Sequence, residues 1–232
     1  MRIKWLLTVL LLLSGCDQPA DSGQGFAGLG SEAAAFSQVT PGRVFGFPAD
    51  HGAHDGYRVE WWYLTANLKD AEGRAFGVQW TLFRNALKAG PEQPGWASQV
   101  VWLGHAAVTS ATTQHAAERY ARGGIGQAGV STVPFAAWID DWRLSSQSAS
   151  GDPLAALRVK ASGEGFSYRL QLTSKRPLVL QGDQGYSRKS AQGQASYYYS
   201  QPFLAASGSL EIDGTVYEVS GPAWLDREWS SQ

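Results

Sequence analysis

The sequence predicts an all-β protein, folded as an antiparallel barrel or sandwich. Segments of alternating polarity recur along the chain, and turn signals such as Asp213-Gly214 separate them. The composition agrees, because Trp, Tyr and Gly are plentiful (10, 9 and 27 residues) and only 17% of residues are charged. A chain of 232 residues is long enough to bury one sizeable core.

The first predicted strand covers residues 58–67, RVEWWYLTAN. Neither of its alternating faces is polar, so we expect both to be covered. A turn leads into the second strand, 74–85, which has one apolar face. Further strands are predicted at 98–111, 141–147, 154–162, 166–174, 203–213 and 215–221. The segment HAAERYARGG (115–124) is predicted to form one short helix across an end of the sheet.

The N-terminus has the order of a secretory signal. Arg2 and Lys4 precede an apolar run, 5–13, that is too short to span a bilayer. The following LSGC resembles the bacterial lipobox, in which the cysteine, here Cys16, becomes the lipidated first residue. This resemblance implies a lipid anchor in the bacterial cell envelope, facing the periplasm, and Asp17 favours the inner membrane. The alternative is an intracellular protein that begins this way by chance.

The chain then divides into three predicted parts. Residues 1–15 are the signal peptide, and residues 16–42 are small, polar and aperiodic, as in a flexible tether. Residues 43–232 form the β-domain. The formal net charge of −1 gives no electrostatic reason to expect nucleic acid as a partner. The final stretch, 226–232, is motif-like, so we expect that a further domain is missing.

Three separated blocks, 47–68, 185–200 and 220–232, resemble the carotenoid 1,2-hydratase/AttH lipocalin-like family. The resemblance spans about residues 43–232 and implies a lipocalin-like antiparallel β-barrel, the first of two tandem domains. Its hydratase members add water to the terminal double bond of an acyclic carotenoid. Its AttH branch is often encoded beside ABC-transporter genes and is labelled a hydrolase. No cofactor is implied.

The motifs favour the AttH branch. Hydratases carry His-x-Trp on one strand and Tyr-x-Asp on a later one, whereas this chain has 197–199 YYY and 224–226 WLD, where only the aspartate matches. If chemistry occurs, Asp226 would be the acid, Glu228 would hold the water, and Tyr197 and Tyr199 would lie nearby to stabilise a cation. A hydrolase is less favoured, because no Gly-x-Ser-x-Gly motif is present.

A structural interpretation of the last strand competes with the catalytic one. Arg227 and Trp229 lie on the strand face opposite to Asp226. We expect them to close the barrel by meeting Glu60 and either Trp61 or Trp62 of the first strand.

His51 and His54 are weak metal-ligand candidates beside Asp50 and Asp55. No third His or Cys stands at a diagnostic spacing, so a polar loop at the barrel mouth is the preferred interpretation and an acid–base role the next.

The preferred function is binding of an apolar small molecule, such as a lipid or isoprenoid, at a membrane surface. The ligand-binding candidates are aromatic: Trp61, Trp62, Trp80 and Trp224. Two alternatives remain: a hydratase-like lyase that uses Asp226, and an accessory subunit that docks an ABC transporter.

Overall fold

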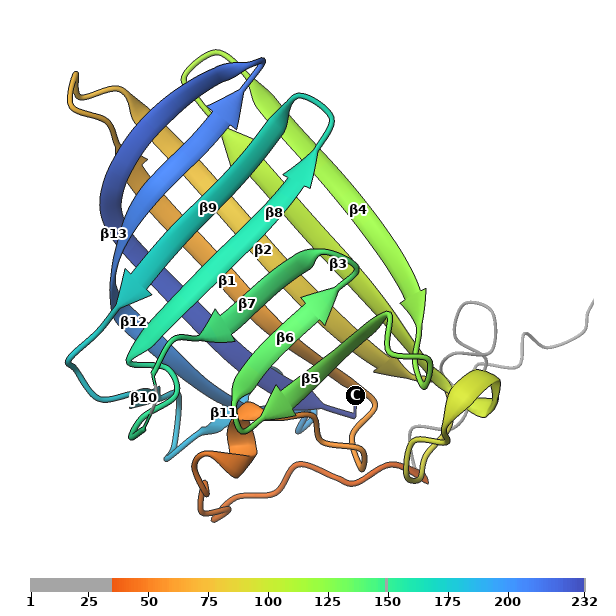
Figure 1. Cartoon of the computed structure of the whole chain (residues 1–232). Coiled ribbons are helices and arrows are strands. Elements are labelled where there is room, and N and C mark those ends of the chain that lie inside the picture. Colours follow the sequence, from red (N-terminus) through yellow and green to blue (C-terminus); the bar gives the residue numbers. More distant parts are fainter. Residues whose placement is uncertain (1–34, 149, 232) are drawn as a thin grey trace, which may run out of the picture. The chain divides into compact units, whose positions relative to one another are not determined.

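The structure is a computed structural model that describes residues 35–148 and 150–231. In that part, one antiparallel sheet of 13 strands accounts for almost all regular structure (Figure 1). Its strands are β1 Val59–Lys69, β2 Ala75–Ala86, β3 Val100–Thr109, β4 Gln114–Arg122, β5 Ala128–Thr132, β6 Phe135–Ile139, β7 Trp142–Ser146, β8 Ala156–Gly163, β9 Phe166–Thr173, β10 Val179–Leu180, β11 Tyr186–Arg188, β12 Ala195–Ile212 and β13 Thr215–Ser230. Two 3₁₀ turns, η3 (Ala49–His51) and η4 (Gly95–Ala97), complete it.

The sheet curls into an almost closed barrel, which confirms the predicted fold class. The strand order is β4-β3-β2-β1-β13-β12-β9-β8-β7-β6-β5, and β10 and β11 pair with β12. Because β1 pairs with β13, the first and last strands are neighbours. Side chains bridge the unpaired edge at β4, where Arg119 pairs with Asp141 and its guanidinium lies 4.4 Å from the Trp142 ring centroid.

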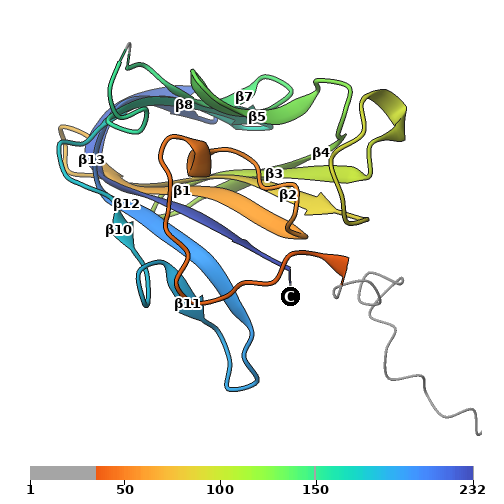
Figure 2. The same ribbon diagram turned by 90° about the horizontal axis from the view of Figure 1, so that it is seen from below.

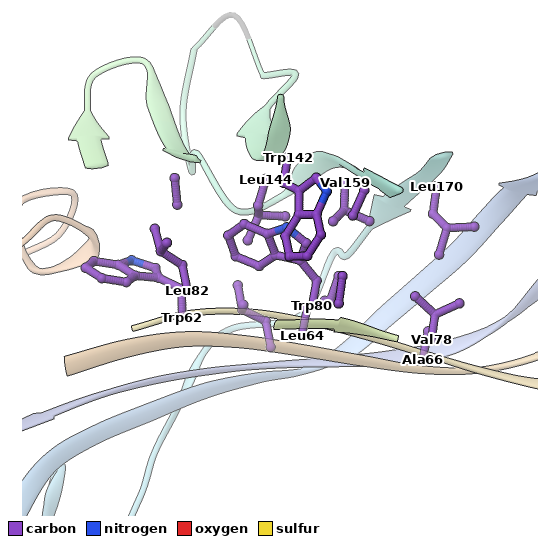
Figure 3. Close-up of a cluster of buried hydrophobic side chains, with 14 of the residues drawn as sticks. Trp62, Leu64, Ala66, Val78, Trp80, Leu82, Trp142, Leu144, Val159 and Leu170 are labelled. Atoms are coloured by element: carbon purple, nitrogen blue, oxygen red, sulfur yellow. The ribbon is translucent and has the colours of Figure 1, made fainter. Parts of the chain in front are cut away.

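The barrel interior is packed with apolar side chains. Strands β5–β9 lie across from β1–β4, so the two halves of the sheet face each other (Figure 2). Trp62, Trp80 and Trp142 are almost completely buried between them, and the close-up shows their rings pointing into one cluster (Figure 3). These three tryptophans therefore belong to the packed core.

One predicted element is wrong. Residues 115–124 do not form a helix, because Gln114–Arg122 is strand β4. Every second residue of β4 turns toward the interior, and the strand pairs with β3 along its whole length. Ala, Glu and Arg favour helices, but pairing to an edge that would otherwise be open outweighs that preference here.

Residues 36–58, here called the strap, cross one end of the barrel (Figure 2). This is the end at which β1 begins and β13 finishes, here called the strap end; the Asp213-Gly214 turn marks the far end. Phe36 is buried, and the Ser231 hydroxyl donates to the Ser37 carbonyl at 2.6 Å. The chain is thus already in contact with the barrel at Phe36 and Ser37.

The predicted signal peptide and most of the predicted tether, including the predicted lipidation site Cys16, lie outside the described residues. In the part that is described, no helix is long and apolar enough to cross a membrane.

Candidate functional site

The strap is tied to the barrel through His51, which η3 places in a buried position. Its Nδ1 lies 2.7 Å from the Tyr199 hydroxyl, and its carbonyl accepts the Trp62 indole N–H at 3.0 Å. Its ring also stacks on Phe47, with 4.8 Å between the ring centroids. Burial lowers the pKa of His51 to about 4, so the imidazole is neutral at neutral pH.

His54 bridges two carboxylates. Its Nε2 lies 3.1 Å from Asp50 Oδ1, and its Nδ1 lies 3.1 Å from Glu60 Oε2. The ring is stacked on Trp229, with 3.9 Å between centroids and an angle of 9° between the planes. Both nitrogens and one face of the ring are therefore occupied by protein groups.

The two carboxylates stay ionised although they are buried. Burial alone would raise the pKa of Asp50, but hydrogen bonds from His54 and the Gly46 N–H, with the charge of Arg43, lower it to about 2. Burial opposes ionisation of Glu60 in the same way. The charge of Arg227 and the hydrogen bond from His54 outweigh it, and the pKa is again about 2.

Arg227 of β13 ties the last strand to the first strand at the strap end of the barrel. Its guanidinium pairs with Glu60 and lies 3.8 Å from the Trp62 ring centroid, so it meets two of the partners expected for it. Arg84 of β2 reaches the same carboxylate at 3.3 Å and also pairs with Asp55 at 3.0 Å. Three strands and the strap thus converge on one buried glutamate. Neither Arg84 nor Tyr199 was assigned to this cluster from the sequence.

The two histidines considered as metal ligands, His51 and His54, instead contact protein groups of the strap and the barrel. His51 and His54 point to different partners, and no cluster of three or more His, Cys, Asp or Glu side chains suited to a metal ion occurs in residues 35–148 and 150–231. The residues of the 50–60 segment hold the strap to the barrel.

The outer face of the same strands carries a second polar cluster. Asp226 Oδ1 accepts the Tyr198 hydroxyl at 2.9 Å, the Ser200 hydroxyl at 2.5 Å and the Trp224 indole N–H at 2.5 Å. Tyr63 of β1 is directly opposite Asp226 in the register. All three donors converge on one carboxylate oxygen, which holds the carboxylate in a single orientation.

Glu228 lies two residues after Asp226, on the same outer face of β13. Its carboxylate pairs with Lys189 at 2.6 Å and accepts the Ser196 hydroxyl. Tyr197 and Tyr199, by contrast, are buried on the inner face, so the expected proximity of these rings to Asp226 is wrong. Strand alternation separates them, and it brings Tyr198 and Ser200 to the aspartate instead.

The candidate ligand-binding tryptophans also divide between the two faces. Trp62 and Trp80 lie in the packed core, whereas Trp61 is half-buried on the outer face and Trp224 is 38% exposed there. They do not line one pocket.

A separate pocket of about 600 Å³ opens at the strap end between the strap and the segment that contains β10. Its lining is mostly apolar: Gly42, Arg43, Val44, Phe45, Phe47, Pro177, Leu178, Leu180 and Gln184. The Phe45 ring separates this pocket from the core, where it packs on Trp229 with 5.4 Å between centroids. No sequence motif marked these residues.

The sequence that builds this strap and barrel also matches a known family. A family model described as AttH-like covers residues 38–232. The chain belongs to the AttH-like family.

Two solved structures are similar to this AttH-like chain. A protein from Nitrosomonas europaea assigned to AttH is 34% identical with a TM-score of 0.70, over 85% of this chain and 59% of that one. Kievitone hydratase from Nectria haematococca is 13% identical with a TM-score of 0.58, over 84% of this chain and 55% of that one. At this identity the similarity shows a shared fold alone. The chain thus spans little more than half the length of these two proteins. No curated protein matched it.

Proposed function

We propose that this AttH-like protein is a lipid-anchored protein of the bacterial cell envelope, facing the periplasm, that binds an apolar small molecule such as a lipid or isoprenoid. The anchor is Cys16, and the binding site is the pocket between the strap and β10. The apolar lining of that pocket is the observation that carries the proposal.

The surroundings of the pocket support this assignment. A volume of about 600 Å³ lies in the range of small-molecule sites. Arg43, its charged residue, already pairs with Asp50 at 2.6 Å, so it offers little to a polar ligand. The strap wall is fixed by the His51–Tyr199 contact at 2.7 Å, so this side of the pocket exists before a ligand arrives.

Titration of the purified full chain with an apolar fluorescent fatty-acid analogue tests this site. The wild-type protein should give a saturable signal. Leu178→Arg, which puts a charge in the pocket, should abolish it, whereas Val216→Arg at the far end should not. Both variants should melt at the wild-type temperature. No saturable signal, or equal binding by both variants, would overturn the proposal.

A second candidate is a hydratase-like lyase in which Asp226 protonates an alkene, water adds to the resulting cation, and the added water returns one proton to the Asp226 carboxylate. It is supported by the fixed carboxylate and by a fold shared with a protein named as a hydratase. Three donors on one oxygen match an ionised carboxylate, however, which suits a base or an anchoring group better than an acid. Glu228, already paired with Lys189, is poorly placed to hold the water.

Asp226→Asn separates the binding protein from the enzyme. The lyase predicts lost conversion of an acyclic isoprenoid alkene to its alcohol, with affinity retained. A chain that neither binds the fatty-acid analogue nor converts the alkene would favour the third role, an accessory subunit that docks an ABC transporter.

A further inference from the structure

We infer that the strap end of the barrel lies against the lipid bilayer and inserts its exposed apolar side chains into the membrane interface. This inference rests on the proposed lipid anchor at Cys16, and it adds which surface of the barrel faces the membrane. It also directs the mouth of the apolar pocket toward the membrane.

The two ends of the barrel differ in exposed apolar side chains. At the far end, among the described residues, the large exposed apolar side chain is Val216. The strap end has several, and they come from the strap, the β2–β3 connection, the β4–β5 connection and the β5–β6 turn: Val44, Phe47, Leu87, Trp96, Ile125 and Val133. Exposed apolar side chains concentrated at one end of a molecule mark an interaction surface.

Trp96 is the most informative of these side chains, because it is 74% exposed on a well-braced turn, η4. The Gly95 N–H donates to the Gly124 carbonyl at 2.8 Å, and Arg122 donates to the Ser98 carbonyl at 3.2 Å. Gly124 has φ +80°, and a Cβ there would meet the Gly95 carbonyl oxygen at 2.4 Å. The chain thus builds a fixed platform that presents an indole ring to its surroundings.

The surroundings of Trp96 suit a lipid interface. An apolar hollow of about 300 Å³ adjoins this loop, with Leu87, Val101 and Tyr120 among its lining residues. Arg122 is exposed in its lining, and the exposed Lys88 follows Leu87 in the chain, so guanidinium and ammonium groups are available to lipid phosphates. Trp and Tyr with a few cations form the combination found at membrane–water interfaces.

The path of the chain specifies the bilayer as the occupant. Ser37 donates its N–H to the Gly56 carbonyl at 2.8 Å, directly before β1, so the described chain enters at the strap end. Only residues 17–34 separate this point from Cys16. About 20 residues reach no more than ~70 Å even when fully extended. A lipid on Cys16 would therefore hold the strap end near the bilayer, whereas the far end would require the connection to run back along the barrel.

A label placed beside Trp96 tests the orientation. Cys16 is the only cysteine, so its lipidation would leave no free thiol and Ala97→Cys would create a unique labelling site. Val216→Cys is the matched control at the far end, where the side chain is 62% exposed. Each full-length lipidated variant is labelled with an environment-sensitive fluorophore. It is then incorporated into phosphatidylcholine–phosphatidylglycerol vesicles that contain brominated acyl chains.

The inference predicts a blue shift and bromine quenching at position 97, and neither at position 216. Equal quenching at both positions, or none at 97, would overturn it. A blue shift at 97 without vesicles would overturn it too, because another copy of the chain would then cover the patch. A free Cys16 thiol in the wild-type chain would refute the anchor of the proposed function and this inference with it, whereas a blocked thiol with an unquenched label refutes the inference alone.

Discussion

The two faces of strands β12 and β13 use neighbouring residues in opposite ways near the strap end. On the inner face, Tyr199 and Arg227 are buried and bonded to the strap and to β1. On the outer face, Tyr198 and Asp226 bond to each other at 2.9 Å and remain partly exposed. Successive residues of a strand point to opposite faces, so one sequence motif on a strand contributes to two separate sites. Here the inner-face residues stabilise the barrel, and the outer-face residues are accessible to a ligand or substrate.

The largest expected effect is on the inner face. Arg227→Ala should lower the free energy of unfolding by about 3–5 kcal/mol, because it leaves Glu60 buried with half of its charge compensation. Urea denaturation measures this change. Arg74→Ala, which removes the pair of Asp70 with an arginine that is 57% exposed at the far end, is the control and should change stability less. Equal effects of the two substitutions would mean that the buried network does not stabilise the strap end of the barrel.

The next effect is a pH dependence of the free energy of unfolding, which comes from the buried groups of the inner face. The folded-state pKa of His51, about 4, lies below its ordinary 6.5, so the unfolded chain binds this proton first as pH falls. Stability should therefore decrease between pH 6.5 and 4, by about 3 kcal/mol from this group. Loss of the ionised Asp50 and Glu60, with pKa values of about 2, adds a further decrease below pH 4.

His51→Gln tests that assignment in thermal melts across the same pH range. The decrease in melting temperature between pH 6.5 and pH 4 should be smaller in this variant than in the wild type. It should persist in His105→Gln, a substitution on the outer face. If the melting temperature of His51→Gln falls with pH as steeply as that of the wild type, another group causes the acid sensitivity.

Two adjacent tyrosines allow the faces to be compared directly. Tyr199→Phe removes the buried hydroxyl that contacts His51 and should cost about 1–3 kcal/mol. Tyr198→Phe removes a hydroxyl that water can partly replace, so its cost should be below about 1 kcal/mol. Equal losses in chemical denaturation would contradict the division between the two faces.

The smallest stability effect is expected for Asp226→Asn. The amide oxygen keeps two acceptor lone pairs for the three donors Tyr198, Ser200 and Trp224, and the site is partly exposed to water. The free energy of unfolding should therefore change by less than about 1 kcal/mol. A loss as large as that of Arg227→Ala would make Asp226 a structural residue and remove the reason to consider it for chemistry.

The β-barrel and the contact between its first and last strands could be predicted from the sequence because their signals are local or repeated. Period-two alternation located β1, β2, β3 and β9, and the Asp213-Gly214 signal located the turn between the last two strands. Glu60 and Arg227 meet as expected. Strand β4 was mistaken for a helix because its Ala and Glu content is helical and its partner edge is invisible in one sequence.

The candidate sites were harder to predict. The grouping of Asp226 with Tyr197 failed, because strand alternation and pairing place the two side chains on opposite faces. The strap pocket had no signal at all, since it joins residues 42–47 to 177–184 through tertiary packing. Whether the outer-face residues act in catalysis and whether Cys16 carries lipid stay predictions.

Mass spectrometry of the organic extract from protein purified out of its own membrane tests the central claim most directly. The account predicts an apolar molecule that co-purifies with wild-type protein and with Val216→Arg, and that is lost from Leu178→Arg. An empty wild-type extract, or the same molecule retained by Leu178→Arg, would contradict binding in the pocket between the strap and β10.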